Sequence, residues 1–300
     1  MKRGSRQSRK EAIEGYLFIS PWLVGFVCLT LGPVVFSFLM SLTSWDMINA
    51  PKWVGAGNYA SIFSDDFRFR QSLKVTAVYA AFAVPLGLIC SLALAMLLNM
   101  NLKGMRVFRS IFYIPAILPG VAVAMVWQVV FRPQGGVFNT ILGWVHVAPV
   151  PWLTTPEWAL PSFVIMSLWG VGGGMIIYLA GLQSVPTQLY EAAEIDGAGS
   201  WKKFRHVTLP MISPTIFFNL MMGVIGSFQV FTSSFVMTQG GPAYATLFYV
   251  LYLYQKAFKY LQMGYACALA WILFAVILAL TLVIFRTSAR WVYYEAELKR

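Results

Sequence analysis

The sequence predicts an all-α polytopic membrane protein with six transmembrane helices, and its composition carries the prediction. Hydrophobic residues make up 59% of the 300 residues and charged residues only 11%, whereas about 25% of the residues in a typical soluble domain are charged. The apolar residues gather in six runs without a charge, each long enough to cross a bilayer as a helix. These predicted spans are residues 17–42, 75–98, 110–131, 158–180, 213–237 and 263–285.

The segments outside the spans complete one membrane domain over residues 16–286, and no internal repeat is detectable. The first span is too long for a cleavable signal peptide and is rich in large residues where a cleavage site needs small ones. The predicted parts outside the spans are a basic N-terminal arm (1–15), connections at 43–74, 99–109, 132–157, 181–212 and 238–262, and a tail (287–300).

The distribution of Lys and Arg predicts the orientation of these spans. Fifteen of the 22 basic residues lie on the side of both termini and the 181–212 loop, and seven lie on the other side. The positive-inside rule therefore predicts cytoplasmic termini and a cytoplasmic 181–212 loop. The net charge of +11 is explained by this topology and by contact of the N-terminal arm with anionic lipid, so no nucleic-acid partner is expected.

The chain carries no energy source of its own. No Asp, Glu, Lys, Arg or His lies inside a predicted span, whereas ion-coupled transporters need intramembrane ionisable groups. The sequence also lacks a phosphate-binding G-x-x-x-x-G-K-[ST] loop, an H-E-x-x-H motif and a cysteine–histidine cluster. We expect no catalytic residues, no metal and no cofactor in this chain, and Cys28, Cys90 and Cys267 are interpreted as packing residues within the spans.

The long cytoplasmic loop contains the most informative segment, EAAEIDGAGSWKKFRHVTLP at residues 191–210. A bare connection needs only a few residues, so a loop of this length indicates a function. Pro186 favours a helix start and Asp196-Gly197 a helix stop. Ser200 is expected to cap a second short helix over residues 201–206. Paired alanines, acidic side chains and sharp turns are suited to docking against another protein.

Three segments together resemble the permease subunits of binding-protein-dependent carbohydrate-uptake ABC importers. The first is Glu191-Ala192-Ala193, Gly197, nine further residues and then a hydrophobic residue followed by x-Leu-Pro. The second is Gly55-x-x-Asn58-Tyr59, and the third runs from Gly226-Ser227-Phe228-Gln229 to Gln239-Gly240-Gly241-Pro242. The resemblance covers roughly residues 16–286.

The resemblance implies the type I importer bundle in the inner membrane of a bacterial cell, with several partners. These are a second homologous permease subunit, two ATP-binding subunits that carry ATP and Mg, and an extracytoplasmic sugar-binding protein. It also implies that a coupling helix at about 187–198 sits in a groove of the ATPase. The implied coupling residues are Glu191, Ala192, Ala193, Asp196, Gly197, Leu209 and Pro210.

A neutral sugar needs hydroxyl partners, flat aromatic faces and small residues that leave room. By analogy with sugar-bound members of the family, the fourth and fifth spans supply the candidate pathway residues Trp169, Gly170, Gly173, Gly223, Ser227 and Gln229. Two other interpretations stay open: the glycines permit close helix packing, and Gln229 and Asn219 form hydrogen bonds between helices.

Two further functions are compatible with parts of the sequence. One is an ABC importer permease for glycerol phosphate or another non-sugar solute, although an anionic substrate favours basic groups that the spans lack. The other is a membrane scaffold without a conduit, which leaves the docking loop unexplained. No motif in the sequence specifies the sugar.

Overall fold

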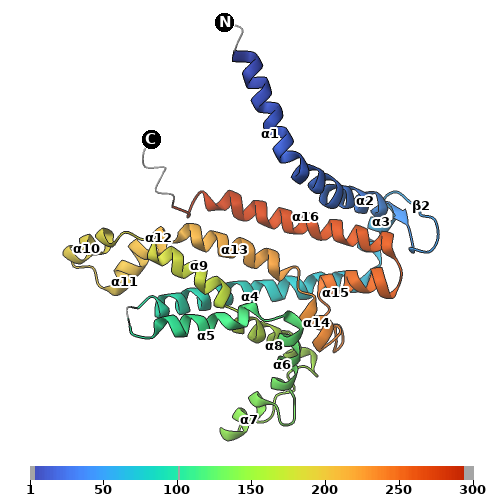
Figure 1. Cartoon of the computed structure of the whole chain (residues 1–300). Coiled ribbons are helices and arrows are strands. Elements are labelled where there is room, and N and C mark those ends of the chain that lie inside the picture. The colour runs from blue at the N-terminus through green and yellow to red at the C-terminus, as the bar shows by residue number, and fades with distance from the viewer. Residues whose placement is uncertain (1–3, 101, 294–300) are drawn as a thin grey trace. The chain divides into compact units, whose positions relative to one another are not determined.

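The computed structural model describes residues 4–100 and 102–293, which are almost entirely helical (Figure 1). They fall into two compact units, which are described separately. One unit comprises the described residues up to Asp65 together with Tyr254–Ile272. The other comprises Asp66–Leu253 and the described residues from Leu273 onward.

The first unit begins with a long interrupted helix. A π-helical turn, Val27–Leu31, joins α1 (Gly4–Phe26) to α2 (Gly32–Ser41), and together they provide the candidate span Arg9–Ser41. The described part of the N-terminal arm, residues 4–15, continues this helix. The elements that follow are the antiparallel strands β1 (Thr43–Ser44) and β2 (Lys52–Trp53), then α3 (Gly57–Ser64).

Hydrogen bonds and one close backbone approach hold the first unit together. The Asn58 side chain donates to the carbonyls of Ser41 and Thr43 at 2.7 and 2.9 Å. The Gly264 N–H donates to the Trp45 carbonyl at 3.2 Å. A β-carbon at Gly264 would lie 2.0 Å from the Thr43 carbonyl oxygen, so only glycine allows this contact.

The second unit is built around the long helix α4 (Phe67–Leu98), which contacts α8, α9 and α13. Its other helices are α5 (Met105–Ile117), α6 (Gly120–Val130), α7 (Val137–Trp144), α8 (Pro156–Trp169), α9 (Gly172–Gln183), α10 (Thr187–Ile195), α11 (Ser200–Lys203), α12 (Leu209–Met211), α13 (Ser213–Ser227) and α14 (Thr232–Met237), with a π-helical turn at Phe204–Thr208. Both units share α15 (Tyr249–Tyr254) and α16 (Met263–Ser288), and a π-helical turn covers Gln255–Lys259.

Four helices are long and apolar enough to cross a membrane, and two bent helix pairs bring the number of candidate spans in the described residues to six. The first pair, α5 and α6, bends by 99°, and the second, α8 and α9, bends by 45°. The first bend follows from Pro119, because a residue before proline avoids the helical conformation and Leu118 is extended at ψ 143°. The predicted count is confirmed, with the difference that the third and fourth spans are broken.

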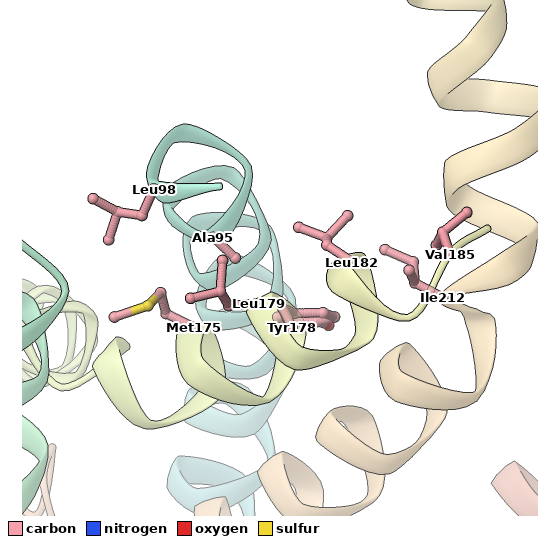
Figure 2. Packing of buried hydrophobic residues seen from close by; sticks show 8 residues of the cluster. All are labelled: Ala95, Leu98, Met175, Tyr178, Leu179, Leu182, Val185 and Ile212. Carbon is pink, nitrogen blue, oxygen red and sulfur yellow. The ribbon is translucent and has the colours of Figure 1, made fainter. Parts of the chain in front are cut away.

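A cluster of buried apolar residues joins α4 to α9 near the segment 187–211 (Figure 2). Tyr178 and Leu179 of α9 pack with Ala95 of α4, and each is at most 7% exposed. Val185, just before α10, and Ile212, just after α12, belong to the same cluster. Both ends of the segment 187–211 are therefore anchored on the helices of the bundle.

Candidate functional site

A cavity of about 350 Å³ lies among α4, α8, α9 and α13. Helix α4 contributes Tyr79, Ala83, Gly87 and Ser91, which recur every four residues and so share one face of the helix. The volume is at the lower end of the range for small-molecule sites.

Polar side chains in the cavity wall keep capacity to accept hydrogen bonds. The hydroxyls of Ser91 and Ser227 donate to the carbonyls of Val171 and Val224 at 3.1 and 2.8 Å. The Asn219 amide nitrogen donates to the Thr215 carbonyl at 2.9 Å. Because each group donates its proton to the main chain, its oxygen remains an acceptor for a ligand hydroxyl. The described residues that line this cavity include no charged side chain.

Glycines make room for these polar groups. A β-carbon at Gly174 would lie 2.9 Å from Ser91 Oγ and 3.2 Å from Asn219 Oδ1. One at Gly223 would lie 3.3 Å from Val84 Cγ1. Larger residues at either position would displace neighbours, so the glycines set the shape of the cavity.

The structure brings three of the six candidate pathway residues to this cavity. Gly170, Gly223 and Ser227 line it. Trp169, Gly173 and Gln229 are outside the lining. Trp169 instead packs edge-on against Trp127, with ring centroids 6.1 Å apart. The role of all six in transport remains a prediction.

Sequence reasoning overlooked Tyr79, Ser91 and Ser167, which also line the cavity. Tyr79 and Ser91 had a recognisable signal, because polar or small residues recur at 79, 83, 87 and 91 within an otherwise apolar span. That four-residue period marks one stripe of small and polar residues on a membrane helix. Ser167 had no comparable signal.

The loop that links α9 to α13 folds as a helical hairpin, residues 187–208, in which α10 is followed by α11 and a π-helical turn. Helix α10 ends at Ile195, three residues before the end of the coupling helix that the resemblance implies (about 187–198), and Gly197 follows with φ +72°. The N–H groups of Gly197 and Ala198 donate to the carbonyls of Glu194 and Ala193 at 3.0 and 2.8 Å. These two bonds form a Schellman motif, which ends the helix at the predicted Asp196-Gly197 stop.

The prediction for the second short helix was wrong in detail. Ser200 is the first residue of α11 rather than its cap, and Gly199 occupies the cap position without a side-chain hydrogen bond. Beyond Lys203 the chain widens into the π-helical turn. Residues 201–206 are helical as expected, but 201–203 belong to α11 and 204–206 to the π-helical turn.

Two side-chain contacts join the arms of the hairpin. Lys203 Nζ lies 2.6 Å from Glu194 Oε1, and the hydroxyls of Tyr190 and Thr208 lie 3.0 Å apart. The hydrogen bond and charge of Lys203 lower the pKa of the Glu194 carboxyl below its usual value. Tyr190 also packs against the buried cluster of Figure 2, so the hairpin and the bundle form one continuous packed structure.

The outer surface of the hairpin exposes most of the residues assigned to coupling. Glu191, Ala192, Asp196 and Gly197 are exposed, and Ala193 is half-buried. Two large apolar side chains stand beside them, since Ile195 is 87% exposed and Trp201 70% exposed. Exposed apolar side chains beside charges are typical of a docking surface.

Two further coupling candidates lie where the hairpin returns to the bundle. Leu209 is exposed and Pro210 is half-buried, and the Ser213 hydroxyl donates to the Pro210 carbonyl at 2.6 Å. Glu194 pairs with Lys203, whereas no ionic partner of the Glu191 carboxylate is found among the described residues.

Comparisons with known proteins agree with this architecture. Residues 68–293 match the family model described as "Binding-protein-dependent transport system inner membrane component". A probable ABC transporter permease of Bacillus subtilis (strain 168), YesP, is 43% identical, over 98% of this chain and 96% of that protein. The trehalose/maltose transport system permease MalF of Thermococcus litoralis is 35% identical, over 93% of this chain and 95% of that protein.

A solved structure shares the fold. It is described as a bacterial ABC transporter involved in the import of the acidic polysaccharide alginate, and it matches with a TM-score of 0.82. The match covers 96% of this chain and 99% of that chain at 24% sequence identity. A family match over most of the chain, together with relatives above 30% identity, establishes that the chain belongs to the binding-protein-dependent inner membrane component family and is an ABC transporter permease subunit, with ATP bound by a partner ATPase.

Proposed function

We propose that the chain imports a sugar or oligosaccharide and forms half of the translocation pathway of the transporter. The observation that carries this proposal is the cavity among α4, α8, α9 and α13, whose described lining is uncharged and holds hydroxyl and amide acceptors. Such a wall suits a neutral solute rich in hydroxyl groups. The sugar-transport role in the name of the T. litoralis relative supports the same substrate class.

In this proposal the hairpin 187–208 and the adjoining Leu209-Pro210 couple the chain to a separate ATPase. The exposed Glu191 pairs with a basic group of the ATPase, and Ile195 and Trp201 supply apolar contact. The remaining partners are a second, similar permease subunit, a second ATP-binding subunit and an extracytoplasmic binding protein. Both termini lie in the cytoplasm, as the distribution of basic residues predicts.

The packing offers a route by which movement of the hairpin reaches the cavity. Val185 and Ile212, at the two ends of the hairpin segment, share one buried cluster with α9 and the end of α4. Val185 follows shortly after the end of α9, and Ile212 directly precedes α13. These two helices contribute Gly174 and Asn219 to the cavity wall. Because a packed cluster moves as a unit, displacement of the hairpin shifts both walls.

Uptake of a panel of radiolabelled neutral mono- and oligosaccharides by a deletion strain tests this function. The wild-type chain should restore uptake of at least one sugar. Ser227→Leu overpacks the cavity, at a cost of about 1–3 kcal/mol, and should reduce that uptake roughly tenfold. Ser20→Leu, in the first span and outside the cavity lining, is the matched control and should transport normally.

Two results would contradict the proposal. If the wild-type chain restored uptake of no sugar in the panel but restored uptake of labelled glycerol phosphate, assayed alongside, the proposed substrate class would be excluded. Equal uptake by Ser227→Leu and Ser20→Leu, at equal membrane levels, would remove the cavity from the pathway.

A further inference from the structure

A second and larger cavity, of about 830 Å³, lies within the unit formed by residues up to Asp65 and Tyr254–Ile272. Its walls come from the β1–β2 hairpin, from α3 and from the segment 256–265. The transport proposal assigns no role to this cavity. Its volume is ample for part of a lipid or another small molecule.

The cavity lies where candidate membrane spans end. The first candidate span ends at Ser41, three residues before the first lining residue, Ser44. The last span begins at Met263, between the lining residues Gln262 and Tyr265. The backbone hydrogen bond from Gly264 to Trp45 joins the wall formed by the segment 256–265 to the wall formed by the β1–β2 hairpin. The cavity is therefore placed at the boundary between bilayer and water.

Positive charge on the walls comes from two lysines. Lys52 stands on β2 and is exposed. The Lys256 ammonium lies 3.1 Å from Gln262 Oε1 and 4.5 Å from the centroid of the Tyr265 ring. The aromatic ring and the amide fix the position of this ammonium group at the cavity.

Negative charge comes from Asp46, which the local turn holds in place. Its Oδ1 accepts from the N–H groups of Ile48 and Asn49 at 3.1 and 2.8 Å, and Oδ2 accepts from the Asn49 side chain at 2.6 Å. Hydrogen bonds from the Asn49 backbone and side chain lower the pKa of the Asp46 carboxyl. A carboxylate and two ammonium groups thus line one cavity.

Apolar side chains surround the same hairpin. Met47 is 47% exposed, Ile48 77%, Trp53 68% and Val54 40%. Tryptophan is enriched at the membrane–water interface, where its ring contacts acyl chains and its N–H contacts headgroups. The hairpin therefore presents apolar surface beside a charged cavity.

We propose that this cavity binds the headgroup of a phospholipid that carries both a phosphate and an ammonium group, of the phosphatidylethanolamine type. Lys52 and Lys256 bind the phosphate, while Asp46 and the ring of Trp45 bind the ammonium. The acyl chains leave along Ile48 and Trp53. This proposal does not depend on the transported solute, since it uses only the membrane location of the protein.

The charges distinguish this ligand from the alternatives. An anionic phospholipid such as phosphatidylglycerol satisfies the lysines but offers no cation to Asp46. A saccharide could bond to the polar groups, but it gives no reason for apolar side chains beside the cavity. A phospholipid whose headgroup carries two opposite charges satisfies all three ionic groups. Its acyl chains account for the exposed apolar side chains beside the cavity.

Native mass spectrometry of the purified full-length chain, titrated with palmitoyl-oleoyl phosphatidylethanolamine and phosphatidylglycerol, tests the proposal. Lys52→Gln should weaken both lipids about fivefold, because one basic group near a lipid surface contributes about 1 kcal/mol. Asp46→Asn should weaken only phosphatidylethanolamine, by a similar factor. Lys259→Gln, an exposed lysine of the same segment outside the cavity lining, is the matched control and should change neither.

Retained phosphatidylglycerol affinity in Asp46→Asn would show that this variant is folded. Equal phosphatidylethanolamine affinities in Asp46→Asn, Lys52→Gln and Lys259→Gln would overturn the proposal. The proposal would also be overturned by a second result: maltotriose binds to the wild-type chain but not to Asp46→Asn or Lys52→Gln, while the affinities of these two variants for both lipids equal those of the wild type.

Discussion

Gly197 shows how one residue shapes the proposed docking surface. Its φ of +72° lies in the left-handed region, and no heavy atom other than those of Gly197 and its two chain neighbours lies within 4 Å of the position that a β-carbon would take. Glycine is favoured here by the backbone conformation rather than by a lack of space for a side chain. The same residue closes the Schellman motif that ends α10 and turns the chain toward α11.

Gly197→Val should therefore strain the turn by roughly 1–2 kcal/mol and weaken binding of the ATPase. Gly197→Asn is the matched variant, because asparagine tolerates the left-handed conformation. Pull-down of the ATPase from membranes that contain equal amounts of each variant measures the effect. Equal recovery with valine and asparagine would show that the turn conformation does not matter for docking.

At the cavity, individual residues also show what the sequence could reveal. Gly170, Gly223 and Ser227 were identified in glycine-rich segments of the spans, and they line the cavity. Trp169 was chosen as a stacking face, but it lies beside the break between α8 and α9 and packs on Trp127. The rotation introduced by such a break is not visible in hydropathy, so the sequence does not show that Gly170 faces the cavity while its neighbour Trp169 packs elsewhere.

Among the elements, the hairpin 187–208 depends on contacts between its two arms. Helix α10 has nine residues and α11 only four, and isolated helices of such lengths are unstable in water. The Glu194–Lys203 pair and the Tyr190–Thr208 contact join arms that are separate in sequence. Both contacts lie between the end of α9 and the start of α13, where movement is transmitted in our proposal.

Glu194→Lys should loosen the hairpin without disturbing the bundle, because it places two like charges together. Hydrogen–deuterium exchange of amides 187–208 should accelerate, while α4 remains protected. The double variant Glu194→Lys, Lys203→Glu restores opposite charges and should return exchange to the wild-type rate. Unchanged exchange in the single variant would mean that the pair contributes nothing, as is common for exposed pairs.

The same pair predicts a pH dependence. The pKa of Glu194 is lowered from its ordinary value of 4.5 in the folded protein. The stabilisation is therefore present above pH 4.5 and is lost as the pH falls through the lowered pKa. Exchange in the hairpin, corrected for intrinsic rates, should rise over that acidic interval in the wild type. It should not rise there in Glu194→Gln.

Element boundaries also show the limit of sequence reasoning. Six apolar runs gave the number of spans, because backbone hydrogen bonding in a bilayer leaves little choice other than helix. The 99° bend between α5 and α6 was not foreseen. Pro119 was visible, but proline kinks vary widely, and the angle depends on packing against neighbouring helices.

For the whole molecule, the charge distribution predicts orientation in the membrane. A reporter fused after Arg300 should be cytoplasmic, and a reporter inserted near Gln134 should lie outside. Both follow from the fifteen-to-seven division of basic residues. A cytoplasmic signal from the Gln134 insertion would contradict the six-span topology.

The central claim is that the hairpin surface couples a separate ATPase to sugar movement through this chain. ATPase recovery and sugar uptake, measured on the same membranes for Glu191→Lys, test the claim most directly. Glu14→Lys makes the same charge change on α1 and is the matched control. We predict that Glu191→Lys loses ATPase binding or uptake, at a cost of about 2–5 kcal/mol, while Glu14→Lys retains both. Wild-type recovery and wild-type uptake with Glu191→Lys would contradict the claim.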